Sequence, residues 1–343
     1  MDHIVSSTAL RIPAFRLVKG GKALPVSSYT RSARTGSQRI AGLADPAAVY
    51  REFEAGATIV LQGLHRYWLP LARFCRDLEI ALGHPTQVNA YITPPGSQGL
   101  AVHSDEHDVF VLQVHGSKRW QVYRPVPALP PDDDPVIEAE LHRGDSLYIP
   151  RGFPHAASTQ ERASAHVTVG ILSYRWADLI REVVRQAQQE AEFAGSLPIR
   201  FADDPDSLGS LAAERLRGFQ LWLDKQEPRE AAERLARLFL TGRRPILAGQ
   251  LQQFELIDSL DDSTLVRRRP GAMCMIRGEG GEEIAVFLGD RELRMPAWVR
   301  PAVERVSEGP PVRVGDLAPH LDGEGRVVLV RRLVREGLLE VIE

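Results

Sequence analysis

Three side chains of this 343-residue sequence have the types and the spacing of a metal site. His103 and Asp105 are separated by one residue, and apolar and β-branched residues flank the pair, as they do in strands. Because residues i and i+2 of a strand face the same side, the His103 imidazole and the Asp105 carboxylate are expected to converge on one point. A second histidine, His155, comes after a turn, a short apolar strand and a Pro/Gly loop.

Two histidines and one carboxylate on one face of a metal ion leave the opposite face open, an arrangement suited to Fe(II) and O2. An HxD triplet alone is common. Here it is followed by Gly-Asp-x-Leu-Tyr-Ile-Pro-x-Gly-Phe-Pro-His, at a spacing that would allow the strands of a barrel to bring the last histidine next to the triplet. We therefore predict that His103, Asp105 and His155 bind iron. Ser104 should point away from the metal. His107 has the same parity and is predicted to lie at the rim of the pocket rather than to be a ligand.

The elements that must position these residues are short strands. Between residues 88 and 172, apolar segments alternate with turns that contain Gly, Pro or Asp, which favours a sandwich or closed barrel, here a double-stranded β-helix of the jelly-roll type. Such a barrel would keep the metal site dry. The predicted strands are VNAYI, LAV, DVFVLQV, RWQVY, DPVIEAEL, SLYIP and HVTVGILS.

The N-terminal part is predicted to contain one short and one long helix. Extended segments and turns are expected up to about residue 45, then a helix over 47–54 and a short buried strand over 57–61. Apolar residues spaced three and four apart predict a helix over 64–82 that buries one face, with Gly83 as its C-cap.

Strand signals stop after Trp176. Helical patterns over 176–193 and after Asp206 and Pro228 predict a helical module over 176–245, whose broad apolar faces would pack either against a second copy of the module or against the barrel. The region 246–343 mixes helices with short strands and a small terminal hairpin, which predicts a winged-helix-like α+β module.

Composition and charge exclude several classes of protein. A content of 43% hydrophobic and 25% charged residues, with a formal net charge of −3, is ordinary for a globular domain. The start resembles no signal peptide, no apolar run reaches membrane-spanning length, and Cys75 and Cys274 lie far apart, so we expect a cytoplasmic protein. Residues 250–343 contain 13 Arg/Lys against 17 Asp/Glu, which disfavours nucleic-acid binding.

The motifs NAYITPPGSQG, AVHSD, HDVFVLQ, GxKRW and VY, followed by GDxLYIPRGFPH, resemble the JmjC-related cupins of the ribosomal-oxygenase type. The match covers about residues 89–170. Members of that family are Fe(II)- and 2-oxoglutarate-dependent protein hydroxylases with a helical dimerisation segment and a C-terminal winged helix. The resemblance implies a mainly β JmjC/cupin catalytic domain over 1–175, a homodimer, and hydroxylation of a side chain in a protein or peptide, a ribosomal protein being one candidate.

The resemblance also implies residues for the cosubstrate. Lys118 would pair with the far carboxylate of 2-oxoglutarate, and the chain, which has 38 arginines and only four lysines, places one lysine here. A compact ammonium suits a narrow barrel interior, although a solvated turn lysine is the alternative. By resemblance Asn89 contacts the cosubstrate and Tyr91 lines the pocket, unless Tyr91 is a core aromatic.

Four further residues have expected roles. His166 and Thr168, on the strand after the second ligand histidine, could hydrogen-bond the cosubstrate carboxylates. Arg119 points away from the face shared by Lys118 and Trp120 and is expected to be structural. Asp145 is expected to hold its turn through the backbone.

Three other functions stay open at this point. A JmjC demethylase would use the same iron chemistry on an N-methyl carbon, and a related hydroxylase would act on a free amino acid or a natural-product peptide. A non-enzymatic nucleic-acid binder with a relic barrel is the third, and the intact HxD…H pattern argues against it.

Overall fold

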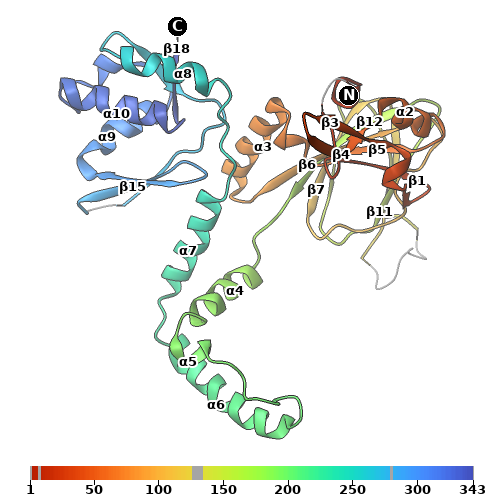
Figure 1. Cartoon of the computed structure of the whole chain (residues 1–343), viewed down its shortest axis with the longest axis horizontal. Helices are drawn as coiled ribbons and strands as arrows, with labels where there is room; N and C mark the ends of the chain where they lie inside the picture. Colours follow the sequence, from red (N-terminus) through yellow and green to blue (C-terminus); the bar gives the residue numbers. More distant parts are fainter. Residues whose placement is uncertain (1, 7–8, 126–133, 279–280, 343) are drawn as a thin grey trace. The chain divides into compact units, whose positions relative to one another are not determined.

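The computed structural model describes residues 2–6, 9–125, 134–278 and 281–342. The chain divides into two compact units, Met1–Ser173 (unit 1) and Tyr174–Glu343 (unit 2) (Figure 1). This boundary lies two residues from the predicted one, and the further division at residue 245 stays a prediction. Among the described residues, no helix combines the length and the apolar character that a membrane span requires.

The main sheet of unit 1 has seven strands in the order β10-β7-β12-β6-β5-β1-β2, and every neighbouring pair is antiparallel. The central strand β12 is buried along almost its whole length because it pairs on both edges, with β6 and with β7. The strands are β1 Phe15–Lys19, β2 Lys22–Ala23, β5 Thr58–Leu61, β6 Thr86–Thr93, β7 Asp108–His115, β10 Ser146–Ile149 and β12 Ser164–Ile171.

A second, three-stranded sheet faces the main one. It has the order β11-β8-β9, with β8 Lys118–Val122, β9 Ile137–Leu141 and β11 His155–Thr159. A hydrophobic cluster that includes Val111 and Ile149 of the main sheet and Trp120 of β8 joins the two sheets. Two antiparallel sheets packed face to face agree with the predicted jelly-roll arrangement.

The sequence reading misassigned two segments close to the site. The predicted strand over 100–102 is not formed; only an isolated bridge joins His103 to His155 there. The segment after Pro154, to which no strand was assigned, is strand β11, which pairs with β8 along its whole length. Pairing with a distant strand decided both outcomes, and local composition does not report it.

The helices of unit 1 begin and end near the predicted residues, with one break. In α2 (Pro46–Glu54), the Asp45 side chain accepts a hydrogen bond from the Ala48 backbone N–H. The helix predicted over 64–82 is instead a 3-10 turn, η2 (Leu64–Arg66), and then α3 (Leu69–Leu82), which has a proline in its first turn. Gly83, with φ 69°, ends it as predicted. The shorter elements are α1 Asp2–Ser6, η1 Val26–Ser28, β3 Thr30–Thr35 and β4 Gln38–Ala44.

The face that α3 buries is only in part the apolar stripe expected from the sequence: Cys75 is buried, and Leu71 and Leu78 pack against the core of unit 1. Arg76 and Glu79 are buried as an ion pair at 3.2 Å, whereas Phe74 and Leu82 are 40% and 42% exposed. The Glu79 carboxylate also accepts a hydrogen bond from the Thr86 backbone N–H at the start of β6. This polar contact ties the helix to the sheet.

Unit 2 begins with helices (Figure 1). The helix predicted over 176–193 is interrupted after Ala187. The next long helix, predicted to follow Asp206, begins at Pro205 and is capped by Asp204. Large apolar side chains stay exposed on these helices, including Trp176 at 82% and Leu216 at 67%. The helices are α4 Trp176–Ala187, α5 Ala191–Ala194, α6 Pro205–Leu223 and α7 Pro228–Thr241.

The rest of unit 2 is α+β, with two three-stranded antiparallel sheets in the orders β17-β13-β18 and β14-β15-β16. The last strand pairs with β13, which lies about seventy residues earlier, so the predicted terminal hairpin is not formed. The winged-helix assignment stays a prediction. The elements are α8 Gln250–Leu256, η3 Ile257–Ser259, β13 Leu265–Arg268, β14 Met275–Arg277, β15 Glu283–Phe287, β16 Glu292–Pro296, η4 Ala297–Val299, α9 Arg300–Ser307, β17 Val312–Arg313, η5 Val314–Leu317, α10 Gly323–Arg335 and β18 Leu339–Ile342.

Candidate metal centre

The three predicted ligands come together in unit 1. One ligand atom each from His103, Asp105 and His155 lies within 4.8 Å of the other two. His103 belongs to the loop between β6 and β7, and His155 is the first residue of β11. Their backbones bridge through two hydrogen bonds, from His103 N to His155 O at 3.2 Å and from His155 N to His103 O at 2.8 Å. This bridge between the two backbones therefore brings the His103 and His155 side chains together.

Backbone carbonyls select the tautomer of both imidazoles. His103 Nδ1 lies 2.9 Å from Ala101 O, and His155 Nδ1 lies 3.0 Å from Phe153 O, the same i−2 relation in each case. A ring nitrogen that donates to a carbonyl carries the proton, so Nε2 of each ring keeps its lone pair for a metal. Burial also lowers the pKa of His155, which favours the neutral, metal-binding form.

Asp105 completes the group. One of its carboxylate oxygens, Oδ2, lies 3.7 Å from His155 Nε2, and its backbone carbonyl accepts a hydrogen bond from Gly152 N at 2.9 Å. The ring centroids of the two histidines are 4.5 Å apart. This donor set, two imidazoles and one carboxylate, is the one predicted from the sequence.

The three side chains open into a cavity of about 400 Å³ between the two sheets. Strand parity explains its walls: alternate residues of β6 and β12 face it, and so do alternate residues of β8. Besides the triad, the lining residues are Arg16, Thr58, Gln87, Asn89, Tyr91, Thr93, Gly99, Leu100, His107, Val109, Val111, Lys118, Trp120, Ala156, Ala157, His166 and Thr168.

Lys118 is buried in this cavity, at 3% exposure, so it is not a solvated turn lysine. Its ammonium donates to Thr93 Oγ1 at 3.0 Å and lies 3.4 Å from His166 Nδ1. In the part of the chain that the structure describes, no carboxylate forms an ion pair with it. Burial lowers the pKa of Lys118 to about 7. Lys118 is thus a buried lysine of this cavity without a carboxylate partner among the described residues.

His166 forms part of the support for Lys118. It is stacked on Tyr91, with ring centroids 4.8 Å apart and planes 5° from parallel, and Trp120 contacts it edge-on at 5.1 Å. Burial, followed by the neighbouring Lys118 charge, holds the pKa of His166 well below its usual range. The ring is therefore neutral, and its Nδ1 can accept a hydrogen bond from Lys118.

The other predicted pocket residues line the same cavity. Asn89 Oδ1 accepts a hydrogen bond from the Gly63 backbone N–H at 3.0 Å, which fixes the orientation of its amide. Thr168 pairs with Asn89 in the β12–β6 register and is half-buried. Tyr91 is half-buried beside them, and burial is the largest of the effects that raise its pKa.

The residues predicted to be outside the metal group are placed as follows. His107 lines the cavity but binds Gln87 Nε2, at 3.2 Å, and does not belong to the ligand group. Ser104 is exposed. Asp145 accepts a hydrogen bond from His142 N in its own turn, and Arg119 pairs with Glu138 on the surface at 2.7 Å.

Four polar residues of the cavity wall were not predicted from the sequence: Arg16, Thr58, Gln87 and Thr93. Thr93 has the same parity as Asn89 and Tyr91 on β6, so extending the alternation by two residues would have found it. Thr58 hydrogen-bonds Thr93 at 3.1 Å, and Arg16 comes from β1. No local pattern marks Thr58 or Arg16, because distant strand pairing brings them to the site.

Comparisons with known proteins show which family this part of the chain resembles. Residues 66–179 match the JmjC domain family. Human ribosomal oxygenase 1 is 29% identical over 345 residues, which cover 93% of this chain and 48% of the human protein. The bovine ribosomal oxygenase 1 is 30% identical over 93% of this chain and 46% of its own length. The chain therefore spans about half the length of the curated relatives it matches.

A solved structure shares the fold. The ribosomal oxygenase YcfD of Escherichia coli aligns with a TM-score of 0.58 at 20% identity, over 96% of this chain and 86% of that chain. A complex of YcfD with cobalt and 2-oxoglutarate aligns with a TM-score of 0.56 at 19% identity over the same shares. Residues 66–179 of this chain thus match the JmjC domain, and the chain has the fold of a ribosomal oxygenase.

Proposed function

We propose that this chain is an Fe(II)- and 2-oxoglutarate-dependent oxygenase that hydroxylates an amino-acid side chain of a protein, with ribosomal proteins as the substrate class. The observation that carries the proposal is the pairing, in one cavity, of a two-histidine, one-carboxylate group with a buried lysine that has no carboxylate partner among the described residues. The names of the similar proteins support the reaction class and the substrate class.

The donor set fits iron. His103 and His155 present Nε2, because their Nδ1 atoms donate to carbonyls, and Asp105 supplies a hard oxygen ligand. The two hydrogen-bonded carbonyls hold the rings in place, as supporting partners of metal ligands do. The three residues would occupy one face of the ion.

The cation site fits the far carboxylate of 2-oxoglutarate. Lys118 would donate to it, Thr93 would add a hydroxyl contact, and His166 would keep the ammonium aimed by accepting one of its protons. Asn89, Tyr91 and Thr168 would line the remaining wall and contact the cosubstrate or the substrate.

The chemistry of the bound iron and 2-oxoglutarate is oxidative: one oxygen atom of O2 goes into succinate, with loss of CO2, and the other goes into a C–H bond of the substrate. The protein's residues do the rest. The two sheets would shield a cavity of about 400 Å³, and His103, Asp105 and His155 would leave one side of the ion for reactants.

The finer predictions belong to the same proposal. The exposed apolar side chains on α4 and α6, such as Trp176 and Leu216, would be covered in a homodimer formed by the helical module. The C-terminal module would be winged-helix-like and would face protein rather than nucleic acid, given its net negative charge. The protein would act in the cytoplasm.

One assay tests the reaction class. The protein is incubated with Fe(II), labelled 2-oxoglutarate and ribosomal proteins, and labelled succinate is measured against the His103→Ala variant. Succinate above the variant's background is expected, and equal values for both proteins would remove the proposal. Intact-mass measurement of the ribosomal proteins then separates hydroxylation, a gain of one oxygen, from demethylation, the loss of a methyl group.

A further inference from the structure

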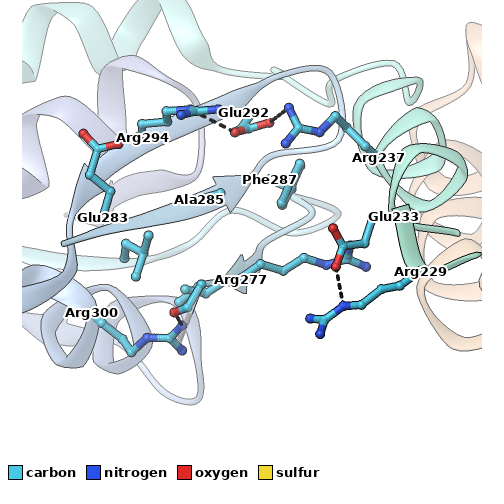
Figure 2. A pocket seen from close by; sticks show the side chains of 13 residues that line it. Arg229, Glu233, Arg237, Arg277, Glu283, Ala285, Phe287, Glu292, Arg294 and Arg300 are labelled. Atoms are coloured by element: carbon cyan, nitrogen blue, oxygen red, sulfur yellow. Dashed lines mark hydrogen bonds and ion pairs between the residues drawn. The ribbon is translucent and has the colours of Figure 1, made fainter. Parts of the chain in front are cut away.

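Unit 2 contains a cavity that is larger than the metal cavity of unit 1. Its volume is about 910 Å³, against about 400 Å³, and it lies between α7, the sheet β14-β15-β16 and the start of α9 (Figure 2). The lining residues are Arg229, Glu233, Arg237, Ile276, Arg277, Gly278, Glu283, Ile284, Ala285, Phe287, Glu292, Arg294 and Arg300.

The lining is charged where a helix over a sheet would ordinarily be apolar. On α7, Arg229, Glu233 and Arg237 are four residues apart and share one face. On the sheet, Arg277 pairs with Ala285 and Ala285 pairs with Arg294, so a row of two arginines is separated by a small side chain. Two strand spacings put the backbones of these arginines about 10 Å apart.

Most of the lining charges already have partners, as the dashed lines in Figure 2 mark. Arg229 pairs with Glu233 at 2.8 Å, and Glu292 pairs with Arg237 at 2.7 Å and with Arg294 at 3.3 Å. Arg300, at the start of α9, pairs with Glu304 of the same helix. Five arginines face three glutamates, so the lining carries a formal charge of +2 within a region of the opposite sign.

Two lining charges have no ion-pair partner among the described residues: Glu283, which is exposed, and Arg277, which is half-buried. Its guanidinium carbon lies 5.8 Å from the ring centroid of Phe287, and that of Arg237 lies 5.9 Å from the same ring. A ring quadrupole compensates a partly buried cation only in part, so an anion in the cavity would bind favourably.

We propose that this cavity binds an acidic segment of a partner protein, with a carboxylate seated on Arg277. The guanidinium offers a planar pair of donors that matches a carboxylate, and Ala285 leaves room beside it. Ile276, Ala285 and Phe287 give the cavity an apolar floor for neighbouring aliphatic carbons. The volume lies near the upper end of small-ligand sites, which suits several residues of a peptide better than one small anion.

Nucleic acid fits the lining less well than a peptide does. Glu233, Glu283 and Glu292 are interspersed with the arginines, and closely spaced phosphates would meet these carboxylates. A peptide can place single carboxylates between them. The site lies in unit 2, separate in the sequence from the metal ligands, so its test does not depend on the oxygenase activity.

The test uses the full chain and a fluorescent, acetylated hexapeptide of alternating Glu and Leu, with the matching Gln-Leu peptide as its control. Fluorescence anisotropy at low salt should show saturable binding of the Glu peptide, at least about tenfold tighter than the Gln peptide. Arg277→Ala should weaken binding at least about tenfold, and Arg305→Ala, an exposed arginine of α9 outside the cavity, should leave it unchanged.

Two further variants guard against a folding artefact. Arg277→Gln keeps most of the side-chain length without the charge and should lose binding as Arg277→Ala does. Ala285→Leu keeps both arginines and should block the space between them. Circular dichroism checks that each variant is folded.

Equal binding of the two peptides, or equal effects of Arg277→Ala and Arg305→Ala, would overturn the proposal. Inorganic phosphate and a single-stranded RNA hexamer are titrated in parallel. Tighter, Arg277-dependent binding of either one than of the Glu peptide would overturn the choice of a protein segment.

Discussion

The cavities of the two units each hold a cation without a carboxylate partner among the described residues, but the cations differ in kind. Lys118 of unit 1 is buried, touches a hydroxyl and a neutral imidazole, and has a pKa of about 7. Arg277 of unit 2 is half-buried against an aromatic ring. A lysine can release its proton when no anion is present, whereas an arginine stays charged.

The difference determines how costly the unpaired charge is when no ligand is bound. Full burial of a charge is costly, so the deeper cavity uses the cation that can become neutral, and an anionic ligand brings the proton back. The wider cavity keeps its cation near water and surrounds it with arginine–glutamate pairs. An unpaired cation in a cavity thus points to an anionic ligand in both units, with a different dependence on pH.

The largest effect is expected at the metal ligands. His103→Ala should lower 2-oxoglutarate turnover by more than about 100-fold. Loss of a residue that only supports a metal ligand costs about 10- to 100-fold, and loss of the ligand itself should cost more. Binding of Mn²⁺ as a stand-in for iron, followed by its electron paramagnetic resonance signal, should fall as well. The neighbouring exposed Ser104→Ala is the matched control, and a Ser104→Ala loss of similar size would argue against the assignment.

Removal of the unit 1 cation should act on the cosubstrate alone. Lys118→Ala should raise the KM for 2-oxoglutarate about 10- to 100-fold, the loss expected for a charge-assisted hydrogen bond, with Mn²⁺ affinity unchanged. Arg277→Ala in the other unit should not change this KM. An unchanged KM in Lys118→Ala would take Lys118 out of the site.

The pH dependence sharpens the contrast between the cations. Free Lys118 loses its proton above about pH 7, and a bound carboxylate favours the protonated form, so its pKa rises on binding. Binding of 2-oxoglutarate to the Mn²⁺ form should therefore take up a proton and weaken by up to about tenfold per pH unit above 7. Binding of the Glu-Leu peptide to unit 2 should be flat over the same range, because guanidinium and carboxylates stay ionised.

Calorimetry in buffers of different ionisation enthalpy measures the proton uptake directly. Lys118→Arg provides the control, since its charge does not titrate in this range and its pH slope should disappear. The same slope in Lys118→Arg as in the unaltered chain would assign the pH dependence to another group.

The smallest effect is expected one residue along β8. Arg119 forms an exposed pair with Glu138, and such pairs contribute little, so Arg119→Ala should change the free energy of unfolding by less than about 1 kcal/mol and leave the KM unchanged. Urea unfolding and the turnover assay check both values. A KM change comparable to that of Lys118→Ala would mean that Arg119 also contributes to the cavity, against the assignment from strand parity.

The family resemblance and strand parity together predicted much of the site. The resemblance implied Asn89, Lys118 and His166, and each of them lines the cavity. Thr93 was within reach of the parity argument. Arg16 was not, because β1 reaches the site through its pairing with β5, a contact between strands about forty residues apart.

Predictions failed where a local pattern met a distant partner. The apolar stripe of α3 predicted a buried face that includes Phe74, but Glu79 binds the start of β6 and turns a polar face inward. The terminal strand β18 pairs with β13 rather than with a neighbour in the sequence. Neither outcome follows from periodicity, since periodicity describes a segment without its neighbours.

The amino-acid sequence by itself determined the types of the metal ligands, the jelly-roll character of the barrel, and which side chains of each strand share a face, because strand parity and ligand chemistry are local properties. Only the tertiary structure decided that His103 reaches the site through a single bridge to His155, and that Lys118 and Arg277 lack carboxylate partners in the described parts of the chain. Whether a charge is paired depends on residues that folding brings close from far along the chain, and no local pattern encodes that distance.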